Sequence, residues 1–95
     1  MSRDANRELL AALTDYLGPL DEVQAKTRDW ASATFVGMRH ELSFNCAADL
    51  VRIDALPDID LPMKRHFVAD LRIISVEGDD VVSTVTLEVL TIADA

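Results

Sequence analysis

The run from Arg28 to Cys46, RDWASATFVGMRHELSFNC, constrains the fold more than any other stretch of this chain. If Val36 and Gly37 form a two-residue turn, the residues before and after it are opposed as an antiparallel pair. Opposed residues of such a pair share a face, and here the apolar residues of both halves fall on the same face. One face then carries the pairs Phe35–Met38, Ala33–His40, Ala31–Leu42 and Asp29–Phe44, and the other carries Thr34–Arg39, Ser32–Glu41 and Trp30–Ser43. The run predicts a β-hairpin, with Gly37 supplying the freedom of a tight turn. The alternative is one bent strand with a bulge at Gly37.

Length and composition predict a single ordered domain over residues 1–95. The 95 residues are 49% hydrophobic and include few glycines and prolines, so the chain can bury one core of modest size. No apolar run is long enough to span a bilayer, and the N-terminus MSRDANRE is polar and charged. The single cysteine, Cys46, cannot form an internal disulfide. These features lead us to expect a cytoplasmic protein.

The net charge of the chain limits the classes of partner that we expect it to bind. Seventeen acidic residues against nine basic ones give a formal net charge of −8. Such a balance repels phosphate backbones and anionic lipid surfaces. We therefore expect neither a nucleic acid nor a membrane as partner.

Two helices are predicted, one before each pair of strands. Over Arg3–Leu17 the apolar residues recur on one side of a 3.6-residue period, and Gly18-Pro19 ends the helix. Leu20–Lys26 then reads as a polar connection. Asn45 can cap a second helix over Cys46–Leu56, which Pro57 stops because the residue before proline avoids the helical region.

The last third of the chain predicts a second hairpin. His66–Ile92 is rich in β-branched residues and is split by the turn signal Glu77-Gly78-Asp79-Asp80. Simple alternation places Phe67, Ala69, Leu71 and Ile73 on the apolar face, and His66, Val68, Asp70 and Arg72 on the other. This apolar set shares a face with Val85, Leu87 and Val89 only if odd-numbered residues of one strand pair with odd-numbered residues of the other. Examples are Ile73 with Val85 and Leu71 with Leu87. We therefore predict a bulge or a five-residue loop at the turn.

The order helix, hairpin, helix, hairpin predicts an α+β fold. The expected architecture is a two-layer sandwich, αββαββ, with a four-stranded antiparallel sheet and both helices on one face. A circularly permuted ferredoxin-like strand arrangement is one option, by analogy alone.

No residues form a recognisable catalytic motif. The chain lacks HExxH, a P-loop and GxGxxG, and its serines have no nucleophile-elbow context. His40 and Cys46 share a strand face, but six residues of strand separate them by about 20 Å. Simple alternation sends His40 and His66 to opposite faces, which argues against a metal site. We therefore predict no catalytic residues, no metal and no cofactor, and a non-enzyme is favoured.

Two function hypotheses remain. The first is a non-enzymatic interaction module that self-associates, as a homodimer, through the outer sheet face or an exposed strand edge. Its candidate interface residues are Trp30, Arg39, Glu41, Val68, Arg72, Glu88, Leu90 and Ile92. The alternative is a small-molecule-binding domain or minor enzyme, with a pocket between helices and sheet. Its candidate pocket residues are Tyr16, His40 and Cys46.

Overall fold

The structure is a computed structural model that describes residues 2–79 and 81–94, without the side chains of residues 2 and 3. The molecule is elongated, with extents of 44 × 22 × 18 Å. Its elements are α1 (Ser2–Leu17), β1 (Asp21–Ala31), β2 (Val36–Cys46), α2 (Leu50–Asp54), the 3₁₀-helix η1 (Leu56–Asp58), β3 (His66–Gly78) and β4 (Ser83–Ala93).

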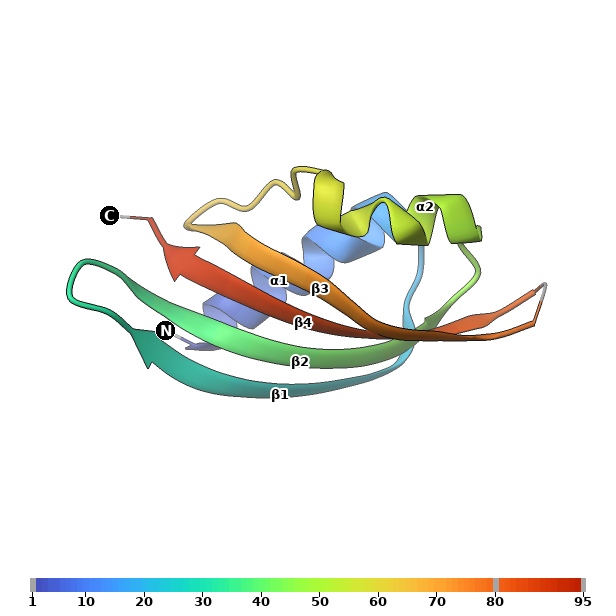
Figure 1. The fold of residues 1–95 in the computed structure, drawn as a ribbon, viewed down its shortest axis with the longest axis horizontal. Coiled ribbons are helices and arrows are strands. Elements are labelled where there is room, and N and C mark those ends of the chain that lie inside the picture. The colour runs from blue at the N-terminus through green and yellow to red at the C-terminus, as the bar shows by residue number, and fades with distance from the viewer. Residues whose placement is uncertain (1, 80, 95) are drawn as a thin grey trace.

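The strands form one curved antiparallel sheet in the order β1-β2-β4-β3 (Figure 1). β2 and β4 occupy its centre, and β1 and β3 are its edges. This confirms the predicted α+β class and the four-stranded antiparallel sheet. The turn between β1 and β2 lies at the end of the molecule where the chain begins and ends (Figure 1).

α1 agrees with the amphipathic pattern of its sequence. Its buried residues recur every three or four positions and include Leu9, Leu13 and Leu17. Gly18 ends the helix in the left-handed conformation, with φ of 88°, and its N–H donates to the carbonyl of Thr14 at 2.8 Å. The predicted helix over Arg3–Leu17 is therefore confirmed within one residue.

The core is one buried cluster to which α1, α2, η1 and the sheet all contribute. Since successive side chains of a strand point to opposite faces, Leu42 and Phe44 define one face of the sheet, called the inner face below. The opposite face, which carries Arg39 and Glu41, is called the outer face. The strand residues of the cluster are Leu42, Phe44, Cys46, Leu71, Val85, Leu87 and Val89. Burying a large side chain such as Phe44 stabilises the fold by about 1.5–3 kcal/mol.

The first hairpin is longer than predicted and turns elsewhere. β1 begins at Asp21, so most of the stretch interpreted as a polar connection, Leu20–Lys26, is strand. Ala31 pairs with Val36, which places the turn at residues 32–35 rather than at Val36 and Gly37. Thr27, not Ala33, is therefore opposite His40. The predicted sorting of side chains onto faces survives, because the register differs from the predicted one by an even number of residues.

The second helix is much shorter than predicted. Cys46 belongs to β2 and pairs with Ser83, so the helix cannot begin there. α2 spans only five residues, and Asp49, not Asn45, caps it by accepting from the N–H of Arg52 at 2.9 Å. The sheet pairing of β2 thus overrides the helical pattern of Cys46–Leu56.

A reciprocal contact joins α1 to α2. The hydroxyl of Tyr16 donates to the carbonyl of Arg52 at 2.8 Å, and Nε of Arg52 donates to the carbonyl of Tyr16 at 2.7 Å. The guanidinium also lies 4.3 Å from the centroid of the Tyr16 ring. A helix as short as α2 is not stable by itself. This contact attaches it to α1, in addition to the buried side chain of Ile53.

We expect Arg52→Ala to lower the free energy of unfolding by about 1–2 kcal/mol, because it removes the hydrogen bond and the cation–π contact together. Tyr16→Phe, which removes only the hydroxyl, should lose about half as much. Urea unfolding followed by circular dichroism measures both. Equal stability of Arg52→Ala and the wild type would show that α2 does not depend on this contact.

The second hairpin contains the predicted odd-to-odd pairing, but its bulges lie inside β3. Leu71 pairs with Val89 and Ile73 with Leu87, two residues away from the predicted partners. Ala69 and Ile74 are each an extra residue on β3. The extra residue Ile74 makes odd-numbered residues of β3 pair with odd-numbered residues of β4, which is the effect that was predicted for the turn. At the turn itself, Gly78 pairs with Ser83. Asp80, also assigned to that turn, lies outside the described residues.

The bulge at Ala69 reverses the faces to which the side chains of the first residues of β3 point. Val68 pairs with Thr91 and packs against the buried cluster, so it lies on the inner face. Phe67 pairs with Ile92, points outward and is 43% exposed. The predicted faces of Phe67, Val68 and His66 are therefore wrong, because simple alternation does not allow for an extra residue.

Candidate interaction surfaces

The outer face of the sheet has a charged row that crosses all four strands. Lys26, Glu41, Glu88 and Arg72 are successive partners in the three strand ladders. Nη2 of Arg72 donates to Glu88 Oε1 at 3.3 Å. The row therefore reads base, acid, acid, base, and includes three of the predicted interface residues.

The next row toward the β1–β2 turn is basic on the β1 side. Arg28 is directly opposite Arg39, which pairs with Leu90, and Leu90 pairs with Asp70. Like charges directly opposite each other weaken the pairing of two strands. Among the described residues, neither of the two ion pairs includes Arg28 or Arg39. This like-charge pair is thus an uncompensated feature of the outer face next to the β1 edge.

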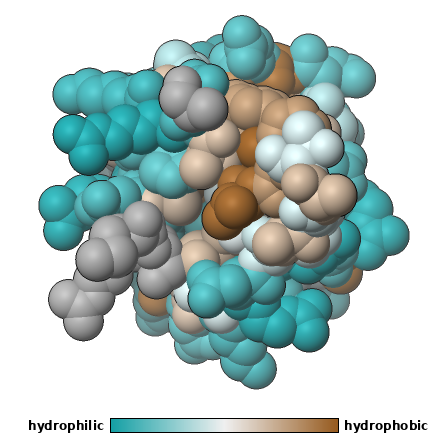
Figure 2. Space-filling view, turned by 90° about the vertical axis from the view of Figure 1, so that its left-hand side faces the viewer, coloured by the Kyte–Doolittle hydropathy of each residue, from teal (hydrophilic) through white to brown (hydrophobic). Residues whose placement is uncertain are grey.

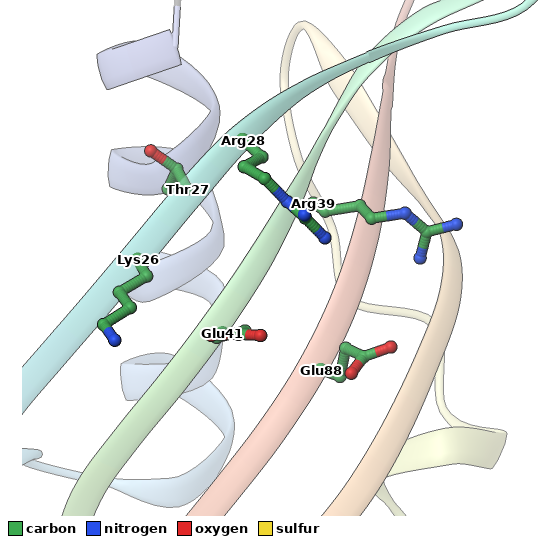
Figure 3. Close-up of a pocket in the computed structure, with 6 residues that line it drawn as sticks. All are labelled: Lys26, Thr27, Arg28, Arg39, Glu41 and Glu88. Atoms are coloured by element: carbon green, nitrogen blue, oxygen red, sulfur yellow. The ribbon is translucent and has the colours of Figure 1, made fainter.

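These charges border a shallow hollow of about 550 Å³ on the outer face (Figure 3). Lys26 and Arg28 come from β1, Arg39 and Glu41 from β2, and Glu88 from β4 (Figure 3). The ribbon of α1 lies behind the strands in this view (Figure 3). The hollow is therefore a charged, open surface that reaches the free edge of the sheet.

The last row before the turn is apolar. Trp30, Gly37, Ile92 and Phe67 are successive partners across the sheet. Ile92 is only 4% exposed although it points away from the buried cluster. Gly37 has no side chain, so Trp30 and Phe67 are the neighbours of Ile92 on this row. Of the predicted interface residues, Ile92 is therefore not accessible to a partner, and Val68 is partly buried on the inner face.

A second hollow, of about 530 Å³, opens at the end of the molecule where β1 turns into β2. Its lining is mainly small or apolar, with Asp29 and His66 as charged or titratable groups; the other lining residues are Ala5, Trp30, Ala31, Val36, Gly37, Met38 and Ala93. Figure 2 looks onto this end and shows apolar side chains gathered among hydrophilic ones. None of the predicted pocket residues lines either hollow.

His40 is buried and fully hydrogen-bonded. It is 0% exposed, with Nε2 2.8 Å from Thr91 Oγ1 and Nδ1 3.3 Å from Asn6 Oδ1. Burial, with a smaller contribution from the charge of His66, lowers the pKa of His40 to about 4. The imidazole is therefore neutral at pH 7, with one nitrogen donating and the other accepting.

The other two predicted pocket residues serve other purposes. Tyr16 contacts Arg52 of α2, and Cys46 is a buried thiol of the core cluster. No described buried side-chain nitrogen or oxygen is left without a hydrogen-bond partner. The structure thus places Tyr16, His40 and Cys46 in packing and hydrogen-bonding roles.

His66 lies on the same side of the sheet as His40, so the prediction that they occupy opposite faces is wrong. Each reaches α1: His40 contacts Asn6, and Nδ1 of His66 is 3.1 Å from Glu8 Oε2. Glu8 Oε1 also accepts from the N–H of Lys64 at 2.7 Å and of Arg65 at 2.9 Å. The Arg65 N–H foremost, helped by His66, lowers the pKa of the Glu8 carboxyl.

The side chains that the structure describes do not assemble a set of metal ligands around the two histidines. Within residues 2–79 and 81–94, no three His, Cys, Asp or Glu side chains gather to hold a metal ion. Within the same ranges, no helix has the length and apolar character needed to cross a bilayer.

The feature that sequence reasoning missed is the free edge of β1. This strand is an edge of the sheet, and all eleven of its residues except Trp30 are exposed. Its inner-face positions are small or polar, so no alternation of apolar and polar residues marks it as a strand. The only available signal is the absence of glycine and proline from Asp21 to Ala31.

Comparison of the chain with protein-family models, with curated proteins and with solved structures finds no match.

Proposed function

We propose that this chain is a protein-interaction module that self-associates by pairing the free edge of β1 with β1 of a second copy. The observation that carries the proposal is the exposure of β1 on both of its faces along the edge of the sheet. A strand edge presents a row of unpaired N–H and C=O groups, which a second strand can satisfy. The two sheets would then be continuous.

β1 offers a regular stretch for such pairing. From Gln24 to Ala31 every residue has a partner on β2 in unbroken register. The one irregularity lies between Asp21 and Gln24, where Glu22 has φ of 51°. A regular backbone on one side of a strand leaves an equally regular edge on the other side.

The opposite edge of the sheet is less suited to pairing. β3 contains the two bulges at Ala69 and Ile74, and bulges bend a strand and interrupt its ladder. With one competent edge, self-association joins identical edges and closes as a two-fold dimer. Pairing of β1 with β3 would instead continue into a fibre.

The edge is a better interface than the outer face. On that face, the charged row through Glu41 and the next row through Arg39 together carry seven charged residues, which are Lys26, Arg28, Arg39, Glu41, Asp70, Arg72 and Glu88. The cores of homodimer interfaces are depleted in charge. Pairing along β1 leaves these side chains in water, so it avoids their desolvation.

Native mass spectrometry and sedimentation of gently purified protein test the proposal. We expect a species of twice the 10.5 kDa chain mass. Thr27→Pro and Arg28→Pro are informative together, because neighbouring residues of a strand direct their N–H groups to opposite sides. One substitution removes a donor from the ladder with β2, and the other removes a donor from the free edge. The folded variant of the two should be a monomer.

Ile74→Lys is the matched control, since it changes an exposed residue of the β3 edge and should leave the dimer intact. A wild-type monomer throughout the micromolar range, or a dimer that survives the folded β1 variant, would refute pairing through this edge. A monomer that carries an unassigned mass would favour the small-molecule hypothesis instead.

A further inference from the structure

We infer that the two copies pair with the two-fold axis at Ala25, which sets Glu22 of each copy opposite Arg28 of the other. This inference rests on the proposed function and adds the register and the residues that select it.

The charges of β1 are segregated along the strand. Asp21 and Glu22 stand at its beginning, and Lys26 and Arg28 follow in its second half. Lys26 and Arg28 lie on the outer face with their β2 partners, Glu41 and Arg39. An antiparallel copy reverses the direction of the strand, so the acidic beginning of one copy meets the basic half of the other.

Two-fold symmetry restricts the registers that are allowed. Opposed residues must share a face, so along the regular stretch from Gln24 to Ala31 each pair of residue numbers has the same even sum. An axis at Thr27 sets Lys26 opposite Arg28 twice, and an axis at Lys26 or Arg28 sets that residue opposite itself. These three registers oppose like charges on the outer face, which weakens pairing.

An axis at Ala25 gives opposite charges instead. Glu22 is then opposite Arg28, and Gln24 is opposite Lys26. The Glu22 carboxylate is already directed to the outer face, because its Oε2 accepts from Asn45 Nδ2 at 3.3 Å. At the axis, Ala25 meets Ala25 on the inner face, where the small side chains allow close approach.

The neighbouring register, with its axis at Gln24, also opposes Glu22 to a base, in this case Lys26. It aligns only residues 21–27, whereas the axis at Ala25 aligns residues 21–29 and therefore more backbone groups. The longer register opposes Asp21 to Asp29 at its two ends. That repulsion is limited because the two side chains point to opposite faces: Asp21 pairs with Asn45 of the outer face, and Asp29 pairs with Met38 of the inner face.

Arg28 has an unfavourable neighbour within its own sheet, Arg39. A carboxylate from a second copy beside Arg28 compensates this like-charge pair. Arg28→Glu should accordingly stabilise the isolated domain slightly, because it creates an opposite-charge pair with Arg39, while weakening association. If Arg28 had a purely structural role, Arg28→Glu would change the stability of the isolated domain and the strength of association in the same direction.

Charge exchange tests the pair directly. We expect Glu22→Arg and Arg28→Glu each to raise the dimer dissociation constant roughly tenfold, since each replaces two attractions by two repulsions. The double variant restores opposite charges and should return the constant to near the wild-type value. Sedimentation equilibrium at low salt measures all four proteins, with chemical denaturation of each as the control for folding.

Cysteine cross-linking tests the axis. Ala25→Cys should cross-link rapidly with a short bismaleimide, because opposed Cβ atoms lie about 5 Å apart. Thr27→Cys is the matched control on the same face, and its two copies would be roughly 14 Å apart along the strand. The wild type, whose Cys46 is buried, measures the background.

The outcomes separate the two proposals. Rescue by the double variant and faster cross-linking at position 25 support the register. A dimer that the β1 proline variant abolishes, but that shows no rescue or cross-links equally or faster at position 27, overturns the register and leaves edge pairing in place. Absence of a wild-type dimer overturns both.

Discussion

Replacing Gly37 by alanine is expected to lower the free energy of unfolding by about 3 kcal/mol or more. A Cβ atom at this position would lie 2.1 Å from the carbonyl oxygen of Thr91 and 3.0 Å from Cδ1 of Ile92. The first of these is a backbone atom of β4, so it can move only if the ladder between β2 and β4 shifts. Because both strands are central, that shift also disturbs the core that they cover.

Gly18→Ala is the matched control for this substitution. Gly18 has φ of +88° and nothing within 4 Å of its added Cβ, so the change introduces backbone strain without a clash. We expect it to cost about 1–2 kcal/mol. Urea unfolding at one protein concentration compares the two variants. If Gly37→Ala were no less stable than Gly18→Ala, close approach of β4 would not be the reason for glycine at position 37.

The stability of the protein is expected to fall by on the order of 3 kcal/mol between pH 6.5 and about 4 because of His40. Burial lowers the pKa of His40 from 6.5 to about 4 in the folded state. The unfolded chain therefore takes up a proton in this interval that the folded protein does not. The stabilisation is complete above pH 6.5 and is lost progressively as the pH falls toward 4.

Unfolding by urea at a series of pH values measures this loss. His40→Gln removes the titrating group, so the slope between pH 6.5 and 4 should flatten, while His66→Gln should retain it. Glu8 contributes in a separate interval: its pKa is below the ordinary 4.5, so its stabilisation is lost only as the pH falls below that value. An unchanged slope in His40→Gln would assign the acid sensitivity to other groups.

Local pattern predicted the parts of the fold that depend on few distant contacts. α1 follows from its 3.6-residue period and from Gly18, both of which act within one turn of the chain. The α+β class and the antiparallel sheet follow from the order of helical and β-branched segments. Face assignment on β2 was also predicted, because it depends only on alternation along the strand.

Strand register and bulges could not be predicted in the same way. The bulge at Ala69 brings His66 and Val68 to the inner face, where Glu8 of α1 holds the backbone at Lys64 and Arg65. That contact joins residues more than fifty positions apart in the chain. Periodicity within β3 contains no information about it, so simple alternation assigned both side chains to the wrong face.

For the candidate interface, too, local pattern predicted one part and the tertiary structure was needed for the other. The outer-face positions of Trp30, Arg39, Glu41, Arg72, Glu88 and Leu90 agree with those predicted. Recognition of β1 as a strand required the structure, because its exposed side chains have no apolar period and its evidence is the backbone pairing with β2.

By itself, the sequence determined which segments are amphipathic, which way alternate side chains sort on a regular strand, and that the chain carries a net charge of −8. The tertiary structure decided where the strands pair, where an extra residue turns a strand over, and which edge stays open. The physical reason is that side-chain pattern is a local property, whereas pairing is set by backbone hydrogen bonds and packing between residues distant in the chain.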